Sequence, residues 1–88
     1  MWYAIQTPHT PDECVKALDE QLAKGPDVLK QFYYGCKKGD HTGYAIVDAK
    51  SNTDARNIVP SFLLNRSRIM EVDVFTPEVI RSLHIKAA

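Results

Sequence analysis

The fold is decided by a stretch in the middle of the chain, Phe32-Tyr33-Tyr34-Gly35-Cys36-Lys37-Lys38-Gly39-Asp40-His41-Thr42-Gly43-Tyr44-Ala45-Ile46-Val47-Asp48. Two apolar, aromatic runs flank a polar turn that contains Gly39 and Asp40. Runs of this kind on both sides of a glycine-containing turn are typical of a β-hairpin. One helix-like segment comes before the hairpin and another comes after it, so the other elements are assigned outward from this point.

The segment before the hairpin contains a strand and a helix. Trp, Tyr and Ile favour a strand over residues 2–7, and two prolines then end it because proline removes backbone donors. A helix is expected over residues 10–25, with Thr10 as its N-cap and Glu13 three residues later. Residues 27–30 are expected to form a connector. The apolar stripe that we expect to face the core consists of Val15, Leu18 and Leu22, with Cys14 and Ala17 beside them.

The segment after the hairpin repeats this order. A second helix is expected to begin at Ser51 or Asn52, and Pro60 should interrupt it because proline breaks the helical hydrogen bonds. A fourth strand is expected over residues 69–75, where side chains alternate between two faces. A Thr-Pro pair then starts a short terminal helix that ends near His84.

The predicted order is β-α-β-β-α-β followed by a C-terminal helix. This is the ferredoxin-like split βαβ arrangement of the α+β class. We therefore expect a single domain over residues 1–88, with a four-stranded antiparallel sheet whose first and third strands lie in the middle. Both main helices should cover one face of that sheet.

The composition is that of a soluble globular protein, with 44% hydrophobic and 25% charged residues. Eleven basic residues balance eleven acidic ones, which argues against nucleic acid or an anionic membrane as a partner. No run approaches the roughly 18 apolar residues of a membrane span, and the N-terminus lacks the pattern of a signal peptide. We expect a cytoplasmic location, where thiols stay reduced.

The sheet face away from the helices should be covered, because aromatic and apolar residues fall on both faces of the strands. A soluble monomer rarely exposes several hundred Å² of contiguous apolar surface. We expect a homodimer in which two sheets pack face to face, since two-fold symmetric dimers are the commonest oligomers. The alternative is that the Tyr and Trp side chains simply lie half exposed.

The chain resembles the dimeric α+β barrels, a group that includes muconolactone isomerases and small ferredoxin-like monooxygenases. The resemblance lies in the order of elements, in the helix over residues 55–62 that Pro60 breaks, and in the closing strand over residues 68–75. It covers most of the chain and concerns the architecture only. It implies a sheet-to-sheet homodimer, and no catalytic residue is carried over from that group.

One edge of the predicted sheet is the first candidate site. The end of the first strand, the start of the first helix, the hairpin turn and the turn before the fourth strand should share this edge. The polar side chains expected there are His9, Thr10, Lys37, Lys38, Asp40, His41, Arg66 and Arg68. With the free N–H groups of the first helix, they would hold a carboxylate or phosphate. The alternative is that polar turns gather at the ends of any sheet.

The cavity behind the sheet is the second candidate site. If the alternate residues from Met70 to Val74 pack under the helices, Glu71 points into this cavity. An apolar cavity would raise the pKa of Glu71 and make it a catalytic proton acceptor, with His9 and His41 assisting at the mouth. The alternative is a solvated acid on an edge strand. The residues expected to bind the ligand are Trp2, Gln6, Tyr34, Tyr44, Asp40, Arg66 and Arg68.

Three histidines and two cysteines raise the question of a metal site. Cys14 and Cys36 lack Cys-x-x-Cys spacing, and no pair of histidines has a recognised ligand spacing. We therefore predict no metal and no cofactor, although the sequence leaves open whether His9 and His41 bind a metal. Cys36 is either a small buried hydrophobe or a reactive thiol whose pKa the two following lysines lower.

The favoured function is the binding of a small organic molecule behind the sheet, with isomerase or cofactor-independent oxygenase chemistry. The sequence does not decide between an enzyme and a non-enzymatic interaction or metabolite-sensing module. An RNA-recognition module is a weaker alternative, because Gly43, Tyr44 and Ala45 match its third-strand pattern. Thr42 is not basic and Ile46 is not aromatic, so the residues that would bind and stack RNA are missing.

Overall fold

A computed structural model describes residues 1 to 87 as four strands, four α-helices and three short 3-10 helices. The elements in chain order are β1 (Trp2–Pro8), η1 (Pro11–Glu13), α1 (Cys14–Lys24), α2 (Pro26–Lys30), β2 (Tyr33–Tyr34), η2 (Cys36–Lys38), β3 (Thr42–Asp48), α3 (Asn52–Asn57), η3 (Ser61–Arg66), β4 (Arg68–Val72) and α4 (Pro77–Ala87). The prediction of an α+β chain with a four-stranded antiparallel sheet is confirmed.

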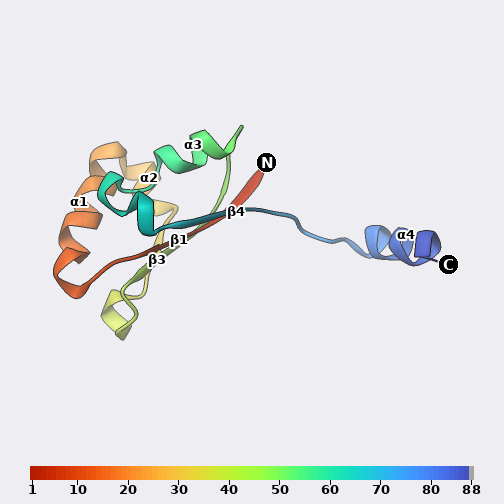
Figure 1. The fold of residues 1–88 in the computed structure, drawn as a ribbon, viewed down its shortest axis with the longest axis horizontal. Helices are drawn as coiled ribbons and strands as arrows, with labels where there is room; N and C mark the ends of the chain where they lie inside the picture. The colour runs from red at the N-terminus through yellow and green to blue at the C-terminus, as the bar shows by residue number, and fades with distance from the viewer. Residues whose placement is uncertain (88) are drawn as a thin grey trace.

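The sheet has the strand order β2-β3-β1-β4, and every pair of neighbours is antiparallel. The first and third strands therefore lie in the middle, as the sequence predicts. Helices α1, α2 and α3 lie together on one side of the sheet, whereas α4 stands apart at the far end of an extended segment (Figure 1). One face of the sheet is thus covered and the other is open.

The core lies between the sheet and the three helices. Side chains of β1 alternate strictly, with Tyr3, Ile5 and Thr7 buried on the helix side. Ala45 and Val47 do the same on β3. The helices contribute small and branched side chains to this core, namely Ala17, Ala55, Val59 and Leu63. Such alternation is expected for an antiparallel sheet with one covered face.

Local capping chemistry explains where the helices begin. The backbone N–H of Thr10 donates to the Glu13 carboxylate at 2.8 Å, and Ser51 accepts from the N–H of Asp54 at 3.2 Å. The hydroxyl of Thr76 accepts from the N–H of Val79 at 3.2 Å. These bonds satisfy donors that a helix N-terminus leaves free, so the three predicted helix starts are confirmed.

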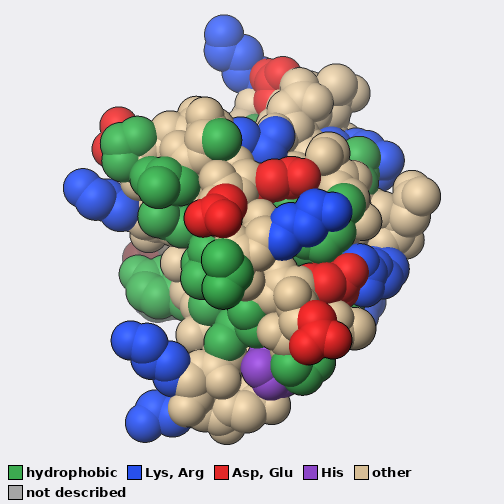
Figure 2. All heavy atoms as spheres, turned by 90° about the vertical axis from the view of Figure 1, so that its left-hand side faces the viewer, with side chains coloured by type: hydrophobic (Ala, Val, Ile, Leu, Met, Phe, Trp, Pro, Cys, Tyr) green, Lys and Arg blue, Asp and Glu red, His purple; other side chains and the backbone are tan. Residues whose placement is uncertain are grey.

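Helix α1 buries a different face from the one its apolar residues predict. Val15 is 69% exposed and Leu22 is 53% exposed, whereas Ala17 and Gln21 are fully buried. The small Ala17 allows the helix to approach the sheet closely, and this contact fixes its rotation. Hydrophobic side chains consequently reach the surface between acidic and basic ones at the end of the molecule that carries α1 (Figure 2).

Several predicted boundaries are wrong. The expected connector over 27–30 is the short helix α2, and β2 keeps only two paired residues because η2 follows almost at once. The predicted interruption at Pro60 is present: α3 ends before this residue, and the 3-10 helix η3 begins directly after it. Strand β4 ends at Val72, and α4 extends three residues beyond His84.

Hydrogen bonds join α1 to the helical segment between β3 and β4, which contains α3 and η3. The N–H of Ser61 donates to the Glu20 carboxylate at 2.8 Å, and Lys24 donates to the Asn57 carbonyl at 2.8 Å.

Among residues 1 to 87, none of the helices combines the length and the hydropathy needed to cross a membrane.

Gly43 is required where β3 passes the aromatic side chain of β2. A Cβ atom at this position would lie 2.5 Å from the hydroxyl of Thr7 and 2.8 Å from the ring of Tyr34. Thr7 is fully buried, so it has no room to retreat. A side chain at residue 43 would therefore push the Tyr34 ring out of its packing position.

We predict that Gly43→Ala lowers the free energy of unfolding by about 2 to 3 kcal/mol, the cost of overpacking a tight site. Urea denaturation measures this change. Lys30→Ala, at an exposed position, serves as the control and should change stability by less than about 0.5 kcal/mol. Equal stability of the Gly43→Ala variant and the wild type would contradict the packing described here.

Candidate metal centre

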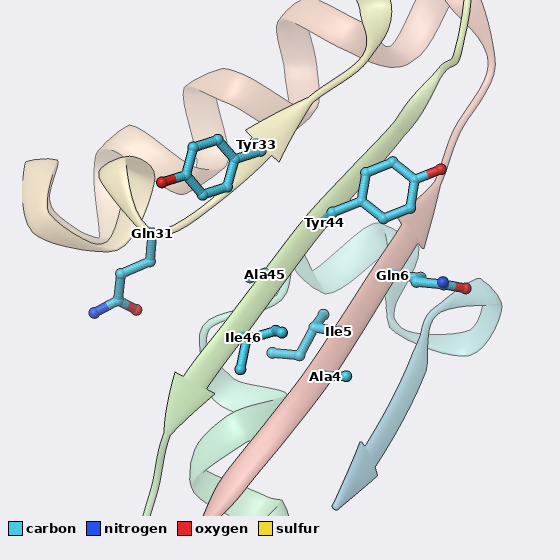
Figure 3. Close-up of a pocket in the computed structure, with 8 residues that line it drawn as sticks. All are labelled: Ala4, Ile5, Gln6, Gln31, Tyr33, Tyr44, Ala45 and Ile46. Carbon is cyan, nitrogen blue, oxygen red and sulfur yellow. The ribbon is translucent and has the colours of Figure 1, made fainter. Parts of the chain in front are cut away.

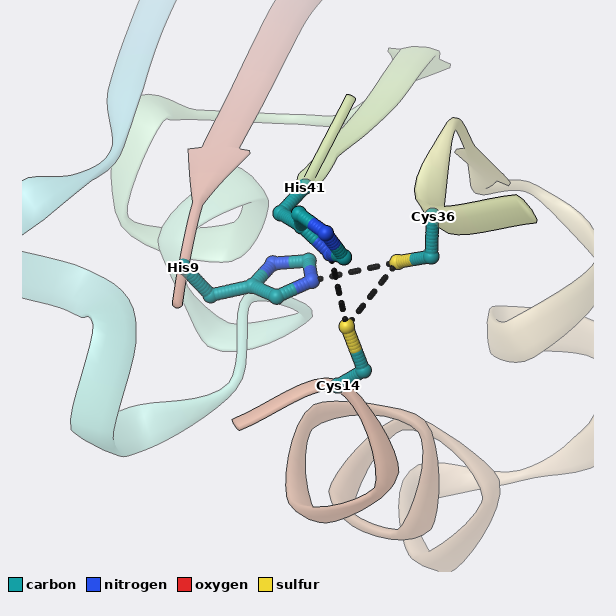
Figure 4. A group of neighbouring side chains, drawn as sticks. All are labelled: His9, Cys14, Cys36 and His41. Atoms are coloured by element: carbon teal, nitrogen blue, oxygen red, sulfur yellow. Dashed lines mark hydrogen bonds between the residues drawn. The ribbon is translucent and has the colours of Figure 1, made fainter. Parts of the chain in front are cut away.

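Four side chains with metal-binding atoms converge at one edge of the sheet. They come from four separate segments: His9 follows β1, Cys14 begins α1, Cys36 begins η2 and His41 precedes β3 (Figure 4). Because β1 and β3 are antiparallel, the end of β1 lies beside the start of β3, and the N–H of His9 donates to the carbonyl of His41 at 2.9 Å. The predicted meeting of these segments at one edge is confirmed.

The distances within the cluster suit a tetrahedral ion. The closest donor atoms are Cys14 Sγ and His41 Nδ1 at 3.1 Å, Cys14 Sγ and Cys36 Sγ at 3.2 Å, and His9 Nε2 and Cys36 Sγ at 3.3 Å. The donor atoms all lie within 4.8 Å of one another. Zinc bonds of about 2.3 Å to sulfur and 2.0 to 2.1 Å to nitrogen give ligand separations of about 3.3 to 3.8 Å. Small rotations of these side chains therefore suffice to surround an ion.

His9 is held in the tautomer that a metal ligand needs. Its ring is buried, and Nδ1 lies 3.1 Å from the carbonyl oxygen of Thr7, which can only accept a hydrogen bond. Nδ1–H therefore donates to Thr7, and the lone pair of Nε2 points toward Cys36. Metal-binding histidines characteristically donate their second ring N–H in this way, which fixes the orientation of the imidazole.

The Cys36 thiol is held in its neutral form when no ion is bound. Burial, together with the hydrogen bond from Cys14, raises the pKa of the Cys36 thiol to about 11. Neither of the following lysines contributes to this shift, so the expected lowering of the Cys36 pKa by these lysines is not seen. A bound cation reverses the balance, because coordination stabilises the thiolate and displaces its proton.

Tyr34 and Gln21 form a buried polar pair behind the cluster. The Tyr34 ring lies 6.0 Å from the His9 ring, and burial raises the pKa of its hydroxyl to about 12, with the Gln21 amide offsetting part of the rise. Within residues 1 to 87, neither the Tyr34 hydroxyl nor the amide of Gln21 has a hydrogen-bond partner of good geometry. Tyr34 thus supports His9 from the core side and does not face the open side of the sheet.

Two charged residues of this edge, Arg66 and Asp40, already have partners within the chain, so neither is free to serve the predicted anion site. Arg66 donates two hydrogen bonds to Glu13, at 2.9 and 2.8 Å, and they hold the pKa of Glu13 at about 2. Tyr44 donates to Asp40 at 2.6 Å and keeps the pKa of that carboxyl low. Arg66 and the N–H of Thr10 are both engaged by Glu13, so neither is free for a phosphate or carboxylate ligand.

The open face of the sheet carries several of the predicted ligand-binding residues. A groove of about 530 Å³ lies on this face, lined by Tyr33, Tyr44, Gln6, Gln31 and Ile46 among others (Figure 3). Trp2 and Arg68 lie on the same face, because Trp2 and Gln6 alternate with buried residues and Arg68 pairs with Gln6. Binding of a small organic molecule there stays a prediction.

The predicted position of Glu71 is wrong. In the register of β1 and β4, Glu71 pairs with Tyr3 and Ile69 pairs with Ile5, so both point toward the helix side. Met70 pairs with Ala4 and therefore lies on the open face. The alternation of β4 is as predicted, but Ile69 packs against the core and sets the opposite phase. Glu71 consequently does not face the cavity in which a catalytic base was expected.

Spacing rules failed to reveal the His and Cys cluster because its contacts join residues that are 22 to 27 positions apart. Four of the five His and Cys residues in the chain take part, and His84 alone lies elsewhere, on α4. The order of the elements could have indicated the cluster. Cys14 stands at the start of α1 and Cys36 at the start of η2, and the predicted fold brings both segments beside His9 and His41. Residues sharing one edge could have been tested as ligands without any spacing motif.

Comparison with known proteins gives no relative on which to draw: no protein family, no curated protein and no solved structure matches the chain. The interpretation of the cluster therefore depends on its donor atoms, their distances and the hydrogen bonds around them. Two thiols and two imidazoles form a donor set that suits zinc better than magnesium or calcium, which prefer oxygen.

We predict that Gln21→Met raises the free energy of unfolding by about 1 to 2 kcal/mol, because it removes a buried amide without partners at nearly constant volume. Chemical denaturation of the metal-free protein measures the gain. Lys30→Met, at an exposed position outside the groove, is the control and should change stability by less than about 0.5 kcal/mol. A clear loss of stability in Gln21→Met would indicate that the amide has an essential partner.

Proposed function

We propose that the protein binds one zinc ion through His9, Cys14, Cys36 and His41. The observation that carries this proposal is the convergence of two thiols and two imidazole nitrogens within 4.8 Å of one another. The hydrogen bond from His9 to Thr7 supports it, since it orients the imidazole before any ion arrives.

The four protein ligands favour a structural role for the ion. A tetrahedral site with four protein ligands has no position left for water or substrate, whereas catalytic zinc keeps one open. The ion would join the end of β1, the start of α1, the η2 turn and the start of β3. A chain of 88 residues has a small core, so the free energy of metal binding would add a large share to its stability.

A redox thiol pair is the second candidate, because Cys14 Sγ and Cys36 Sγ lie only 3.2 Å apart. A disulfide would shorten this distance to about 2.05 Å. The two histidines beside the thiols favour the metal, since a simple disulfide needs neither of them. Oxidation would also remove two of the four ligands, so the two states exclude each other.

The architecture that we propose is a short variant of the ferredoxin-like arrangement. The central positions of β1 and β3 support it, together with helical crossovers on one side of the sheet. The variant differs in its two-residue β2 and in the replacement of a long second helix by α3 and η3. A small-molecule enzyme on this scaffold would need a catalytic group other than Glu71.

Zinc binding is tested on reduced, metal-free protein by titration with Zn²⁺ and with Co²⁺, whose absorption reports tetrahedral thiolate coordination. We expect one ion per chain and a free energy of unfolding raised by about 4 kcal/mol when free zinc is 1,000 times Kd. Loss of any one ligand should weaken zinc binding by at least about 100-fold, because loss of a residue that only hydrogen-bonds to a metal ligand already costs 10- to 100-fold. The variants are Cys14→Ser, Cys36→Ser, His9→Asn and His41→Asn.

The matched control for these variants is His84→Asn, which removes the one histidine outside the cluster and should change zinc affinity less than about two-fold. Failure of the wild type to retain zinc, or equal loss in His84→Asn, would contradict the proposal. Rapid formation of a Cys14–Cys36 disulfide without any zinc binding would favour the redox alternative.

A further inference from the structure

Helix α4 carries an apolar stripe against which nothing packs among residues 1 to 87. Ile80 and Leu83 lie three residues apart on one side of the helix, with Val79 beside them, and Leu83 is 52% exposed. The helix stands apart from the sheet and the other helices, and the whole molecule including α4 spans 53 Å along its longest axis (Figure 1). An isolated helix of 11 residues is marginal in water, so α4 needs a surface to stabilise it.

The open face of the sheet is an uncovered apolar surface in the same chain. Ile46 is 67% exposed and Tyr33 is 76% exposed. The large apolar and aromatic side chains on this face are Trp2, Tyr33, Tyr44, Ile46 and Met70. Trp2, Tyr33 and Ile46 are each more than half exposed, so the face carries an uncovered apolar patch of the kind that marks an interaction site. The groove beside Tyr33, Tyr44 and Ile46 has room for aliphatic side chains (Figure 3).

We propose that α4 of one copy packs on the open sheet face of a second copy, and that the exchange is reciprocal. Ile80 and Leu83 would enter the groove between Tyr33 and Ile46 of the second chain. In a two-fold symmetric dimer each chain gives one helix and receives one, so both apolar surfaces are covered at once. This pairing differs from direct packing of one sheet on the other.

The segment before α4 favours exchange over docking on the same chain. Residues 73–76 form no regular structure and lead α4 away from the sheet (Figure 1). Thr76 precedes Pro77, and a residue before proline is restricted to extended conformations. A reversal back onto the same sheet would have to occur within a few residues of extended chain. Reaching a second copy requires no such reversal.

The exchange covers two sheet faces and two α4 stripes in one continuous interface, and specific dimer interfaces bury roughly 1,200 to 2,000 Å² in total. A single α4 docked on its own sheet would leave no interface between chains. The exchange therefore makes fuller use of the same residues.

Sedimentation equilibrium of the zinc-loaded protein at micromolar concentration tests the proposal. We expect the wild type to be a dimer and both Leu83→Asp and Ile46→Asp to be monomers, with a dissociation constant raised at least 100-fold. Ile85→Asp changes the same helix on its other side, and Val15→Asp changes the exposed stripe of α1. Both of these controls should remain dimers.

A complementation experiment tests whether the helix and the sheet meet between chains. Leu83→Asp and Ile46→Lys chains should each be monomeric alone and should form a heterodimer when mixed, because the altered helix then meets the altered sheet with opposite charge. Far-ultraviolet circular dichroism and zinc content, measured on every variant, separate loss of the dimer from loss of folding or of the metal site.

Three outcomes would overturn the exchange. A monomeric wild type would do so, whether α4 then docks on its own sheet or on nothing. A dimer that survives both Leu83→Asp and Ile46→Asp would place the interface elsewhere. Equal dissociation by Ile85→Asp or Val15→Asp would show that any added charge is enough. None of these outcomes bears on zinc binding, which the same samples report separately.

Discussion

The backbone hydrogen bond from the N–H of His9 to the carbonyl of His41, 2.9 Å long, is the contact on which the candidate site depends. It continues the pairing of β1 with β3 one step beyond Pro8 and Thr42, the last paired residues. Two imidazoles are thereby brought together, with their ring centroids 6.1 Å apart. The thiols of Cys14 and Cys36 then close the cluster from the first turn of α1 and from η2.

Without an ion, the polar groups behind the cluster lack favourable partners among the described residues. Two thiols and two rings lie close together, the Cys36 thiol resists ionisation, and the buried amide of Gln21 and hydroxyl of Tyr34 have no good partners among the described residues. An ion of charge +2 with two thiolates forms a neutral unit that suits this partly buried position. Four segments from different parts of the chain would then share one rigid junction.

Much of this fold follows from local patterns in the sequence. Thr10 with Glu13, Ser51 and Thr76 mark helix starts, and the alternation of β1 and β3 identifies their buried faces. The rotation of α1 could not be predicted, since Val15, Leu18 and Leu22 form the more apolar stripe and close packing of Ala17 prevails. The phase of β4 was missed for a similar reason, because Ile69 and not Met70 meets the core. The cluster itself depends on contacts across 22 to 27 positions, which no spacing rule covers.

X-ray absorption at the zinc K-edge, recorded on reduced protein loaded with one equivalent of zinc, tests the central claim most directly. The account predicts a four-coordinate ion with two sulfur neighbours at about 2.3 Å and two imidazole nitrogens at about 2.0 to 2.1 Å. A spectrum dominated by oxygen neighbours, or one with no sulfur in the first shell, would contradict it.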